Sequence, residues 1–331
     1  MEYVRGDRFG PDFTNKRAHS LHRFLKRCAA HPVLRRAVLL TIFLESSDWN
    51  AHMRQHPKRG QSASEQSSGV FDNLADTFVN AFSKVHKPDK RFIEVREKAD
   101  KLDEDLAHVS RVIARIARRE SDLETDYGDL STQFLKLETM EPGVEPEVHA
   151  FAHGVQQTAR GLQALKEHTD QDYLGSLRDM EAYTGSLKSL LKYREQKQLD
   201  FEDLTQYLTK ATSDRDSLAN NHSSQSAKAF IRSKIEDARG VDHEQSRRDR
   251  LRKLEMQIER LSAEVENARK SSEAYDNEVV REVQDFERIK AAEFKDSLGS
   301  LADHHVQFYD SVIDTWERYL KEMAVEDDRD G

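Results

Sequence analysis

The sequence is poor in cysteine, proline, glycine and aromatic residues. Its single cysteine, Cys28, excludes an intramolecular disulfide framework and a cysteine-rich metal site, so we expect a reducing compartment. Aromatic residues make up 8% of the chain and only 13 of its 331 residues are glycine, while 34% are charged. These proportions disfavour a β-rich or α/β core and favour elongated helices.

Long hydrophobic runs and catalytic motifs are also missing. The longest strongly apolar run, AVLLTIFL at 37–44, is far shorter than the roughly 20 residues that span a bilayer. The sequence has no Gly-rich phosphate loop and no GxSxG motif. His149 and His153 are four residues apart, but no motif places a third ligand near them. We therefore expect a cytoplasmic protein that is not an enzyme and carries no metal or cofactor.

Proline is absent after Pro146, which leaves 185 residues free of it. Since an interior proline costs a helix about 3 kcal/mol, this stretch is suited to long helices. Apolar residues recur at steps of three and four over 89–137, two prolines and a glycine interrupt the pattern at 138–147, and a second helical stretch covers 147–209. After a polar loop at 217–226, a third stripe begins near 241. The predicted fold is all-α, with three long helices whose wide stripes favour dimerisation.

Positive charge is concentrated at the start of the chain. Residues 1–59 contain 12 Lys and Arg but 5 Asp and Glu, a charge of +7 in a chain of net charge −9. No acidic residue lies between Phe13 and Leu44. This asymmetry indicates an anionic partner, for which nucleic acid and an anionic membrane both qualify on composition alone.

The segment FTNKRAHSLHRFLKRC at 13–28 predicts a helix with two kinds of positive charge. Leu21, Phe24, Leu25 and Cys28 form its apolar face, and Arg17 lies one turn before Leu21 on that same side. We expect this packing side to give Arg17 a carboxylate or a ligand anion as partner. A separate stripe is expected to face solvent and to attract an anionic surface; it consists of Lys16, Arg23 and Arg27.

A short amphipathic helix is predicted over 70–86. Its apolar face consists of Phe71, Leu74, Phe78, Phe82 and Val85. Packing on neighbouring helices and insertion into a lipid interface explain this pattern equally well. Burying five such side chains gives roughly 10 kcal/mol, which is comparable with the cost of ordering the segment, so any insertion would be conditional.

A second basic region lies at the turn between the second and third long helices. Residues 228–253 carry nine Lys and Arg against five acids. As a basic tip they could contact an anionic membrane, and a solvated helix with internal ion pairs explains them as well. The candidate tip residues are Lys228, Arg232, Lys234, Arg239, Arg247 and Arg248.

Three stretches of the sequence resemble a known family. FTNKRAHSLHRFLKRCAAHP, followed by SSDWN, resembles the C-terminal half of a phox-homology (PX) domain. YREQKQLDFEDLTQYL at 193–208 resembles the second-helix signature of sorting nexins with a BAR domain, and DNLADTF at 72–78 resembles their amphipathic helix. The likeness is to sorting nexins of the fungal sorting nexin 4 type and extends over nearly the whole chain.

The resemblance implies a domain order and a function. The expected order is a C-terminal PX remnant at 1–50, a linker at 51–69, an amphipathic helix at 70–87 and a BAR domain at 88–325 that forms a curved antiparallel dimer. In this family the PX domain recognises phosphatidylinositol 3-phosphate and the BAR dimer senses or generates curvature. Such proteins retrieve membrane proteins, including SNAREs, from endosomes to the Golgi and serve selective autophagy and cytoplasm-to-vacuole transport.

The resemblance also implies partners and a location. We expect an anionic, phosphoinositide-bearing membrane, endosomal cargo proteins, and a second BAR-type sorting nexin in a homodimer or heterodimer, with no nucleic acid. The protein would be peripheral on endosomes and pre-autophagosomal membranes. A rival interpretation is a soluble coiled-coil dimeric scaffold whose basic N-terminus binds an acidic protein or nucleic acid.

Only one residue of the family's headgroup pocket is matched. That pocket uses an Arg-aromatic pair on a strand, a lysine after a proline-rich loop, and an arginine at the start of the next helix. The arginine matches Arg17, whereas the other positions would precede Met1. The chain is therefore expected to hold a truncated PX domain with weak headgroup selectivity.

Overall fold

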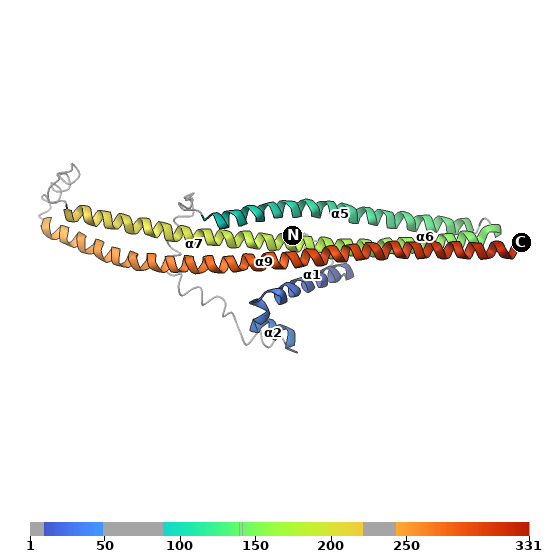
Figure 1. Ribbon diagram of the computed structural model, residues 1–331, viewed down its shortest axis with the longest axis horizontal. Helices are drawn as coiled ribbons and strands as arrows, with labels where there is room; N and C mark the ends of the chain where they lie inside the picture. The colour runs from blue at the N-terminus through green and yellow to red at the C-terminus, as the bar shows by residue number, and fades with distance from the viewer. Residues whose placement is uncertain (1–9, 49–88, 139, 141, 221–242, 331) are drawn as a thin grey trace. The chain divides into compact units, whose positions relative to one another are not determined.

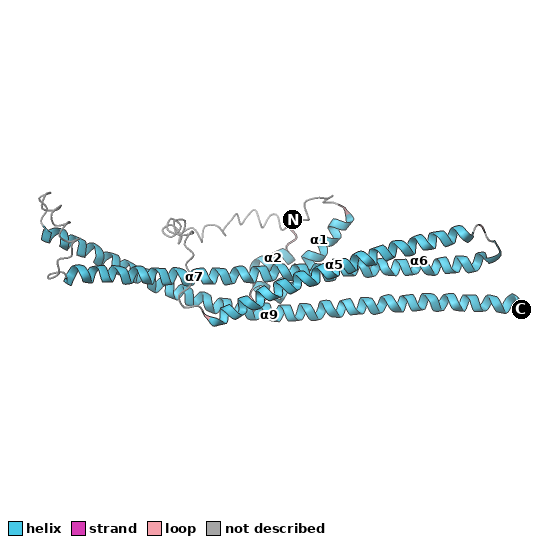
Figure 2. Ribbon diagram, turned by 90° about the horizontal axis from the view of Figure 1, so that it is seen from above, coloured by secondary structure: helices cyan, strands magenta, loops and turns pink. Residues whose placement is uncertain are grey.

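Every regular element that the structure describes is a helix (Figure 2). The computed structural model describes residues 10–48, 89–138, 140, 142–220 and 243–330. The predicted all-α class is confirmed for this part of the chain. The linker at 51–69, the helix with Phe71, Leu74, Phe78 and Phe82, and the basic residues Lys228, Arg232, Lys234 and Arg239 lie outside the described residues.

The N-terminal segment forms three short elements (Figure 1). They are α1 (Pro11–Ala30), the 3-10 helix η2 (Leu34–Arg36) and α2 (Val38–Glu45). α1 begins with Pro11 in its first turn, where a missing N–H costs nothing and the fixed φ favours a helix. α2 has no buried residue although its sequence is almost wholly apolar.

Three long helical stretches follow (Figure 1). The first is α5 (Lys90–Glu138) and the third is α9 (His243–Asp330); the second consists of α6 (Glu145–His168), the π-helical turn η4 (Thr169–Leu174) and α7 (Gly175–Asn220). The 3-10 helix η3 (Pro142–Val144) precedes α6, which starts with Pro146 and two glutamates in its first turn. This is the break that the prolines predict, and the acidic first turn suits the positive end of the helix dipole.

α7 continues further than the sequence pattern indicates. The polar loop predicted to begin at residue 217 is wrong for its first four residues, which are the last of α7. Arg247 of α9 explains the difference, because its guanidinium donates to the carbonyl oxygens of Leu218 (3.2 Å) and Ala219 (2.9 Å). These carbonyls have no partner within their own helix, so a side chain from elsewhere in the chain stabilises the last turn.

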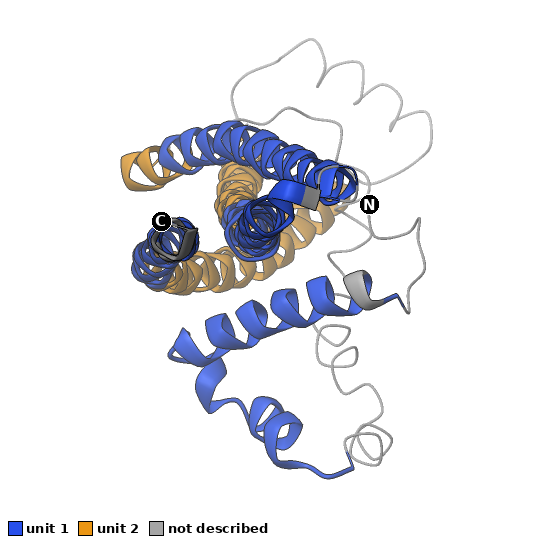
Figure 3. Ribbon diagram, turned by 90° about the vertical axis from the view of Figure 1, so that its right-hand side faces the viewer, with its two compact units in different colours: residues 1–55, 97–187, 284–331 blue, residues 56–96, 188–283 orange. Residues whose placement is uncertain are grey.

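The described chain divides into two compact units (Figure 3). Unit 1 contains residues 1–55, 97–187 and 284–331, and unit 2 contains residues 56–96 and 188–283. α5, α7 and α9 contribute to both units.

Unit 1 is built on close approach between α6 and α9. A Cβ at Gly161 would lie 3.1 Å from Cδ2 of Phe308, and one at Gly154 would lie 3.4 Å from the indole ring of Trp316. Phe151 of α6 packs between Phe134 and Trp316, with ring centroids 4.7 and 5.4 Å away. Because glycine has no side chain, α6 presents a smooth surface on which the aromatic rings of α9 lie.

Unit 2 contains a buried ion pair. Arg194 of α7 is 7% exposed, and its Nε and Nη2 donate to the two carboxylate oxygens of Asp276 at 2.7 and 3.0 Å. Its guanidinium also lies 4.1 Å from the ring centroid of Phe92. Arg194 belongs to the 193–208 segment, so one residue of that segment joins α5, α7 and α9 within unit 2.

Candidate functional site

α1 contacts the long helices of unit 1 through its basic side. Five of its side chains each reach a carboxylate of η4, α7 or α9. The pairs are Lys16–Asp170, His19–Asp172, Arg23–Asp179, Lys26–Asp296 and Arg27–Glu293. We call the five carboxylates (Asp170, Asp172, Asp179, Glu293 and Asp296) the acidic platform.

Arg27 makes the most complete of these contacts. Its Nε and Nη2 donate to Oε1 and Oε2 of Glu293 at 2.6 and 2.7 Å, and its Nη1 donates to the carbonyl oxygen of Asp179 at 3.1 Å. The side chains of Arg27 and Glu293 are only 17% and 20% exposed. The guanidinium also lies 5.7 Å from the ring centroid of Tyr183. A two-pronged pair of this kind is both stronger and more directional than a single hydrogen bond.

Arg23 lies against the π-helical turn. Its Nε donates to Oδ2 of Asp179 at 2.6 Å and its Nη1 donates to the carbonyl oxygen of Gln171 at 3.1 Å. A π-helical turn shifts the intrahelical hydrogen-bond pattern, and such turns are often found at functional positions. Gly175 provides the space, because a Cβ there would lie 2.6 Å from Nη2 of Arg23.

The outer pairs are more exposed. Nζ of Lys16 lies 3.1 Å from Oδ2 of Asp170, and Nζ of Lys26 lies 3.0 Å from Oδ2 of Asp296. The two lysine side chains are 49% and 63% exposed. Pairs of this kind contribute about 0–1 kcal/mol each and weaken with salt. The two arginines therefore carry most of the contact.

Asp172 joins two histidines. Its carboxylate lies 2.6 Å from Nδ1 of His19 and 2.9 Å from Nδ1 of His168. The hydrogen bond from His168, followed by that from His19, lowers the pKa of Asp172 against the opposing effect of burial. His168 also stacks on His304 with ring centroids 3.4 Å apart.

A cleft of about 270 Å³ lies where α1 meets η4, α7 and α9. Its walls include Arg23 and Lys26, together with Asp172, Glu293 and Asp296. The cations in this cleft are already neutralised by carboxylates, so its lining does not form an anion pocket.

The structure contradicts the predicted faces of α1 in part: Leu25 and Cys28 are half-buried and Lys16 is half exposed, but the other residues differ. Arg23 and Arg27 do not face solvent, whereas Leu21 and Phe24, placed on the packing side, are 45% and 59% exposed. Arg17 is exposed, and no described residue gives it a hydrogen bond or ion pair. Carboxylates far along the chain, which no local pattern reveals, attract the basic side to the long helices. A role for Arg17, Lys16, Arg23 and Arg27 in lipid binding stays a prediction.

Of the predicted basic tip, only Arg247 and Arg248 are described. Arg247 is engaged with the end of α7, while the side chain of Arg248 is 75% exposed and lies 3.5 Å from Glu244. Arg248 is therefore the more available of the two.

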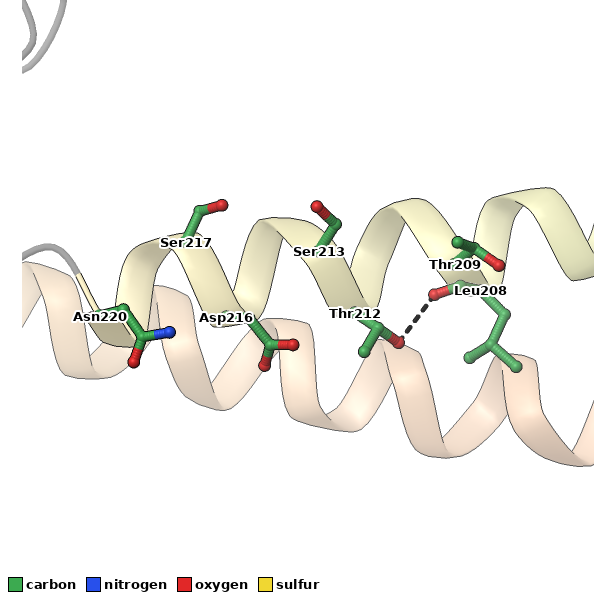
Figure 4. A pocket seen from close by; sticks show the side chains of 7 residues that line it. All are labelled: Leu208, Thr209, Thr212, Ser213, Asp216, Ser217 and Asn220. Carbon is green, nitrogen blue, oxygen red and sulfur yellow. Dashed lines mark hydrogen bonds between the residues drawn. The ribbon is translucent and has the colours of Figure 1, made fainter.

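A shallow hollow on α7 lies near this end of the helix (Figure 4). Seven residues line it, from Leu208 to Asn220, and all of them belong to α7. Figure 4 shows Thr212 bonded to the carbonyl oxygen of Leu208 in its own helix, at 2.9 Å. Because a single helix supplies the lining, with Asp216 as its only charge, we do not regard the hollow as a binding site.

Two apolar rows on unit 1 are left uncovered. The α5 stripe has large apolar residues seven apart, 39% to 45% exposed: Val109, Ile116, Leu123, Leu130 and Leu137. The α9 stripe is 51% to 65% exposed: Leu298, Val306, Tyr309, Ile313 and Leu320. All five positions of the α5 stripe belong to the predicted apolar pattern, and so do Ala99 and Leu106. The structure buries these two, at 3% and 4% exposure, together with Ala117 at 7%.

Metal chemistry finds no support in the described ranges. They hold no group of three or more His, Cys, Asp or Glu side chains placed to bind an ion. His149 lies 3.2 Å from Glu138, and His153 lies 3.3 Å from Gln157. Within the same ranges, no helix has the length and hydropathy of a membrane span.

Sequence reasoning missed the acidic platform and the pair of Arg194 with Asp276. One signal was present: the 272 residues after position 59 carry a net charge of −16, which opposes the +7 of the N-terminal segment. That difference suggests attraction between the two parts of the chain, but it names no partner residue.

The family models and the curated relatives agree on one family. Family models match a PX domain over residues 4–47 and a Vps5 C terminal like domain over 67–240 and 222–322. Sorting nexin-4 of Emericella nidulans is 65% identical over 98% of this chain and 69% of its own length. That of Saccharomyces cerevisiae is 36% identical over 96% of this chain and 74% of its own length. The solved structure of the Imp2 F-BAR domain is more distant, with 15% identity, a TM-score of 0.39, and coverage of 68% of this chain and 78% of that one.

PX and BAR domains bind lipid and scaffold membranes, and they are not enzymes. The matched models cover most of the chain, and the relatives match it nearly from end to end. The chain therefore belongs to the sorting nexin-4 family of membrane-binding, dimerising sorting nexins.

Proposed function

We propose that this sorting nexin binds anionic, phosphoinositide-bearing endosomal membrane as a dimer. In that role it retrieves membrane proteins, including SNAREs, from endosomes to the Golgi, and it serves selective autophagy and cytoplasm-to-vacuole transport. Family membership supports the membrane role, and the uncovered apolar stripes of α5 and α9 are the observation in the structure that carries the dimer.

The partner on these stripes is a second BAR-type chain. Single exposed apolar residues are common on protein surfaces, but here ten large apolar side chains lie in two rows. Exposed apolar patches of this kind are typical of interaction surfaces. Each side chain of this size gains roughly 1.5–3 kcal/mol when it leaves water. The residues of the α5 stripe recur every seven positions, which is the repeat that places side chains along the contact between two long helices.

Flotation with vesicles tests the membrane role. The protein would be mixed with vesicles of 50 and 400 nm diameter, made with or without phosphatidylserine and phosphatidylinositol 3-phosphate. We expect binding to the anionic vesicles, stronger on the smaller ones. Failure to bind any anionic vesicle would contradict the proposal.

The helix at 70–86 separates the membrane role from a soluble scaffold. Replacing Phe71 and Phe78 by serine removes two of the apolar groups that the sequence places on one face. We expect weaker flotation of the double variant and unchanged dimerisation. Unchanged flotation would remove this helix from the proposed mechanism.

Transport itself is tested in fungal cells that lack their own sorting nexin-4. Expression of this chain is expected to restore the return of a tagged endosomal SNARE and the delivery of a selective-autophagy cargo. Restoration of neither would leave membrane binding without the proposed transport role. Co-purification from the same cells would distinguish a homodimer from a heterodimer.

A further inference from the structure

The same cations of α1 that the sequence predicts to bind an anionic surface are occupied within the chain. Arg27 uses its Nε, Nη1 and Nη2 on Glu293 and on the carbonyl oxygen of Asp179. Arg23 uses its Nε and Nη1 on Asp179 and on the carbonyl oxygen of Gln171. A lipid phosphate would need these donors, and both side chains are less than 20% exposed.

We propose that the basic face of α1 has two mutually exclusive partners, the acidic platform of its own chain and an anionic lipid bilayer. Membrane binding through this face would then detach α1 from α7 and α9. This inference rests on the proposed function, since it requires that the chain meets an anionic membrane.

The character of the contact makes it reversible. Charged side chains form it, while the apolar residues Leu21 and Phe24 of α1 stay exposed. Little apolar area is therefore lost when α1 leaves. The exposed pairs of Lys16 and Lys26 and a basic side chain beside an anionic membrane have similar strengths, so the exchange depends mainly on the contacts of Arg23 and Arg27.

The emptied platform would reinforce the exchange. Once α1 has left, five carboxylates from three elements lose the basic side chains of α1, and only Asp172 keeps a described partner, His168. Like charges repel one another and repel an anionic membrane. The detached state therefore suits a membrane that holds α1 itself but keeps the platform at a distance.

Gly175 gives a test that changes no charge. A side chain at this position would occupy the space of Arg23 Nη2, whose distance to a Cβ would be 2.6 Å. Gly185 of the same helix has open space around it, with nothing within 4 Å of a Cβ. Gly175→Leu should thus push the Arg23 guanidinium away from Asp179 and loosen α1, and Gly185→Leu is the matched control.

The experiment combines vesicle affinity with a distance measurement. Nitroxide labels would be attached to Cys28, the only cysteine, and to an exposed site on α9 through Ala291→Cys. Vesicles would contain phosphatidylcholine alone or with phosphatidylserine and phosphatidylinositol 3-phosphate. Circular dichroism would confirm that each variant keeps its helices.

The expected result has two parts. The distance between the labels should lengthen when the parent chain binds anionic vesicles, and without vesicles it should be longer in Gly175→Leu than in Gly185→Leu. Gly175→Leu should bind these vesicles about three- to tenfold more tightly than Gly185→Leu, because the contact between α1 and the platform is already weakened.

Several results would overturn the inference while the proposed function survives. They are binding with an unchanged label distance, equal affinity of the two glycine variants, and weaker binding by Gly175→Leu. Displacement of α1 by soluble polyglutamate but not by vesicles would likewise reject the lipid as partner. If no protein binds any vesicle, the proposed function itself fails.

A second pair of variants covers the case in which Gly175→Leu does not fold. Glu293→Gln removes the charge that holds Arg27, and Glu104→Gln makes the same charge change at an exposed position of α5. The first should bind anionic vesicles more tightly than the second. Equal binding would overturn the inference.

Discussion

Arg27 and Glu293, 266 residues apart in the sequence, form a two-pronged ion pair with donor–acceptor distances of 2.6 and 2.7 Å. The pair joins α1 to α9. Around it, the acidic platform binds the other basic side chains on the same side of α1. Lys16, Arg23, Lys26 and Arg27 of the N-terminal segment therefore form ion pairs within their own chain.

A double-mutant cycle measures this pair. Arg27→Ala and Glu293→Ala should each weaken the contact of α1 with the long helices. The free-energy loss of the double variant should be smaller than the sum of the two single losses by about 1–3 kcal/mol. The measurement is the fraction of α1 in contact, taken from the distance between the two nitroxide labels. Arg17→Ala, which loses no described contact, is the control, and additive losses would contradict the prediction.

The exposed stripes predict how dimerisation fails. Leu130→Asp and Ile313→Asp each place a charge in an apolar row, and a two-fold interface contains each change twice. We expect each to weaken the dimer at least about tenfold, since each removes a burial worth roughly 1.5–3 kcal/mol. Sedimentation equilibrium would show this. Met256→Asp, at a position 65% exposed and outside both stripes, should leave the dimer intact.

Glu120 predicts a pH dependence of stability. This residue is 8% exposed, and no described residue gives its Oε2 a hydrogen bond. Burial raises the pKa of its carboxyl against the smaller opposing effects of Thr169 and His305. Because the folded pKa lies above the ordinary 4.5, the ionised form costs stability at neutral pH. The cost falls as the pH drops through the raised pKa, and it vanishes below about 4.5.

Glu120→Gln should therefore stabilise unit 1 at pH 7 and become equal to the parent chain near pH 4. Urea unfolding at a series of pH values would measure the difference. A difference that does not change with pH would show that the amide acts through packing and not through charge.

Two glycines predict opposite effects of the same kind of change. Gly161→Leu should destabilise unit 1 by about 1–3 kcal/mol, because a Cβ there lies 3.1 Å from the ring of Phe308 and a larger side chain must displace it. Gly299→Ala, with open space around its Cβ, should instead stabilise α9 by about 0.5–1 kcal/mol. Thermal melts followed by circular dichroism would compare them. A stabilised Gly161→Leu would contradict the close approach of α6 and α9.

Arg194 predicts a large loss within unit 2. Arg194→Ala leaves Asp276 without its partner in a partly buried place and removes the cation from the ring of Phe92. Removal of one residue of a buried ion pair lowers the free energy of unfolding by about 3–5 kcal/mol. Arg194→Lys should recover only part of it, because an ammonium cannot form the two-pronged contact. Chemical denaturation would measure both variants, and full recovery by lysine would argue against the geometry.

Local patterns were sufficient for the helices but not for their ends or their neighbours. The absence of proline after Pro146 and the apolar steps of three and four predict the three long stretches, since both depend on residues within one helix. The predicted end of α7 is wrong because Arg247, 28 residues after Ala219, donates to the carbonyl oxygens of the last turn. The π-helical turn at Thr169–Leu174 gives no signal in the pattern either.

The sequence by itself determined the helical class, the uneven charge and the family resemblance, because each resides in composition, spacing or short motifs. Only the tertiary structure decided which side of α1 is in contact, since the carboxylates that attract Arg23 and Arg27 lie 156 and 266 residues away. It also decided which part of the α5 pattern is buried within one chain and which is left for a partner. Helical periodicity identifies an apolar face, but only packing in three dimensions shows what covers it.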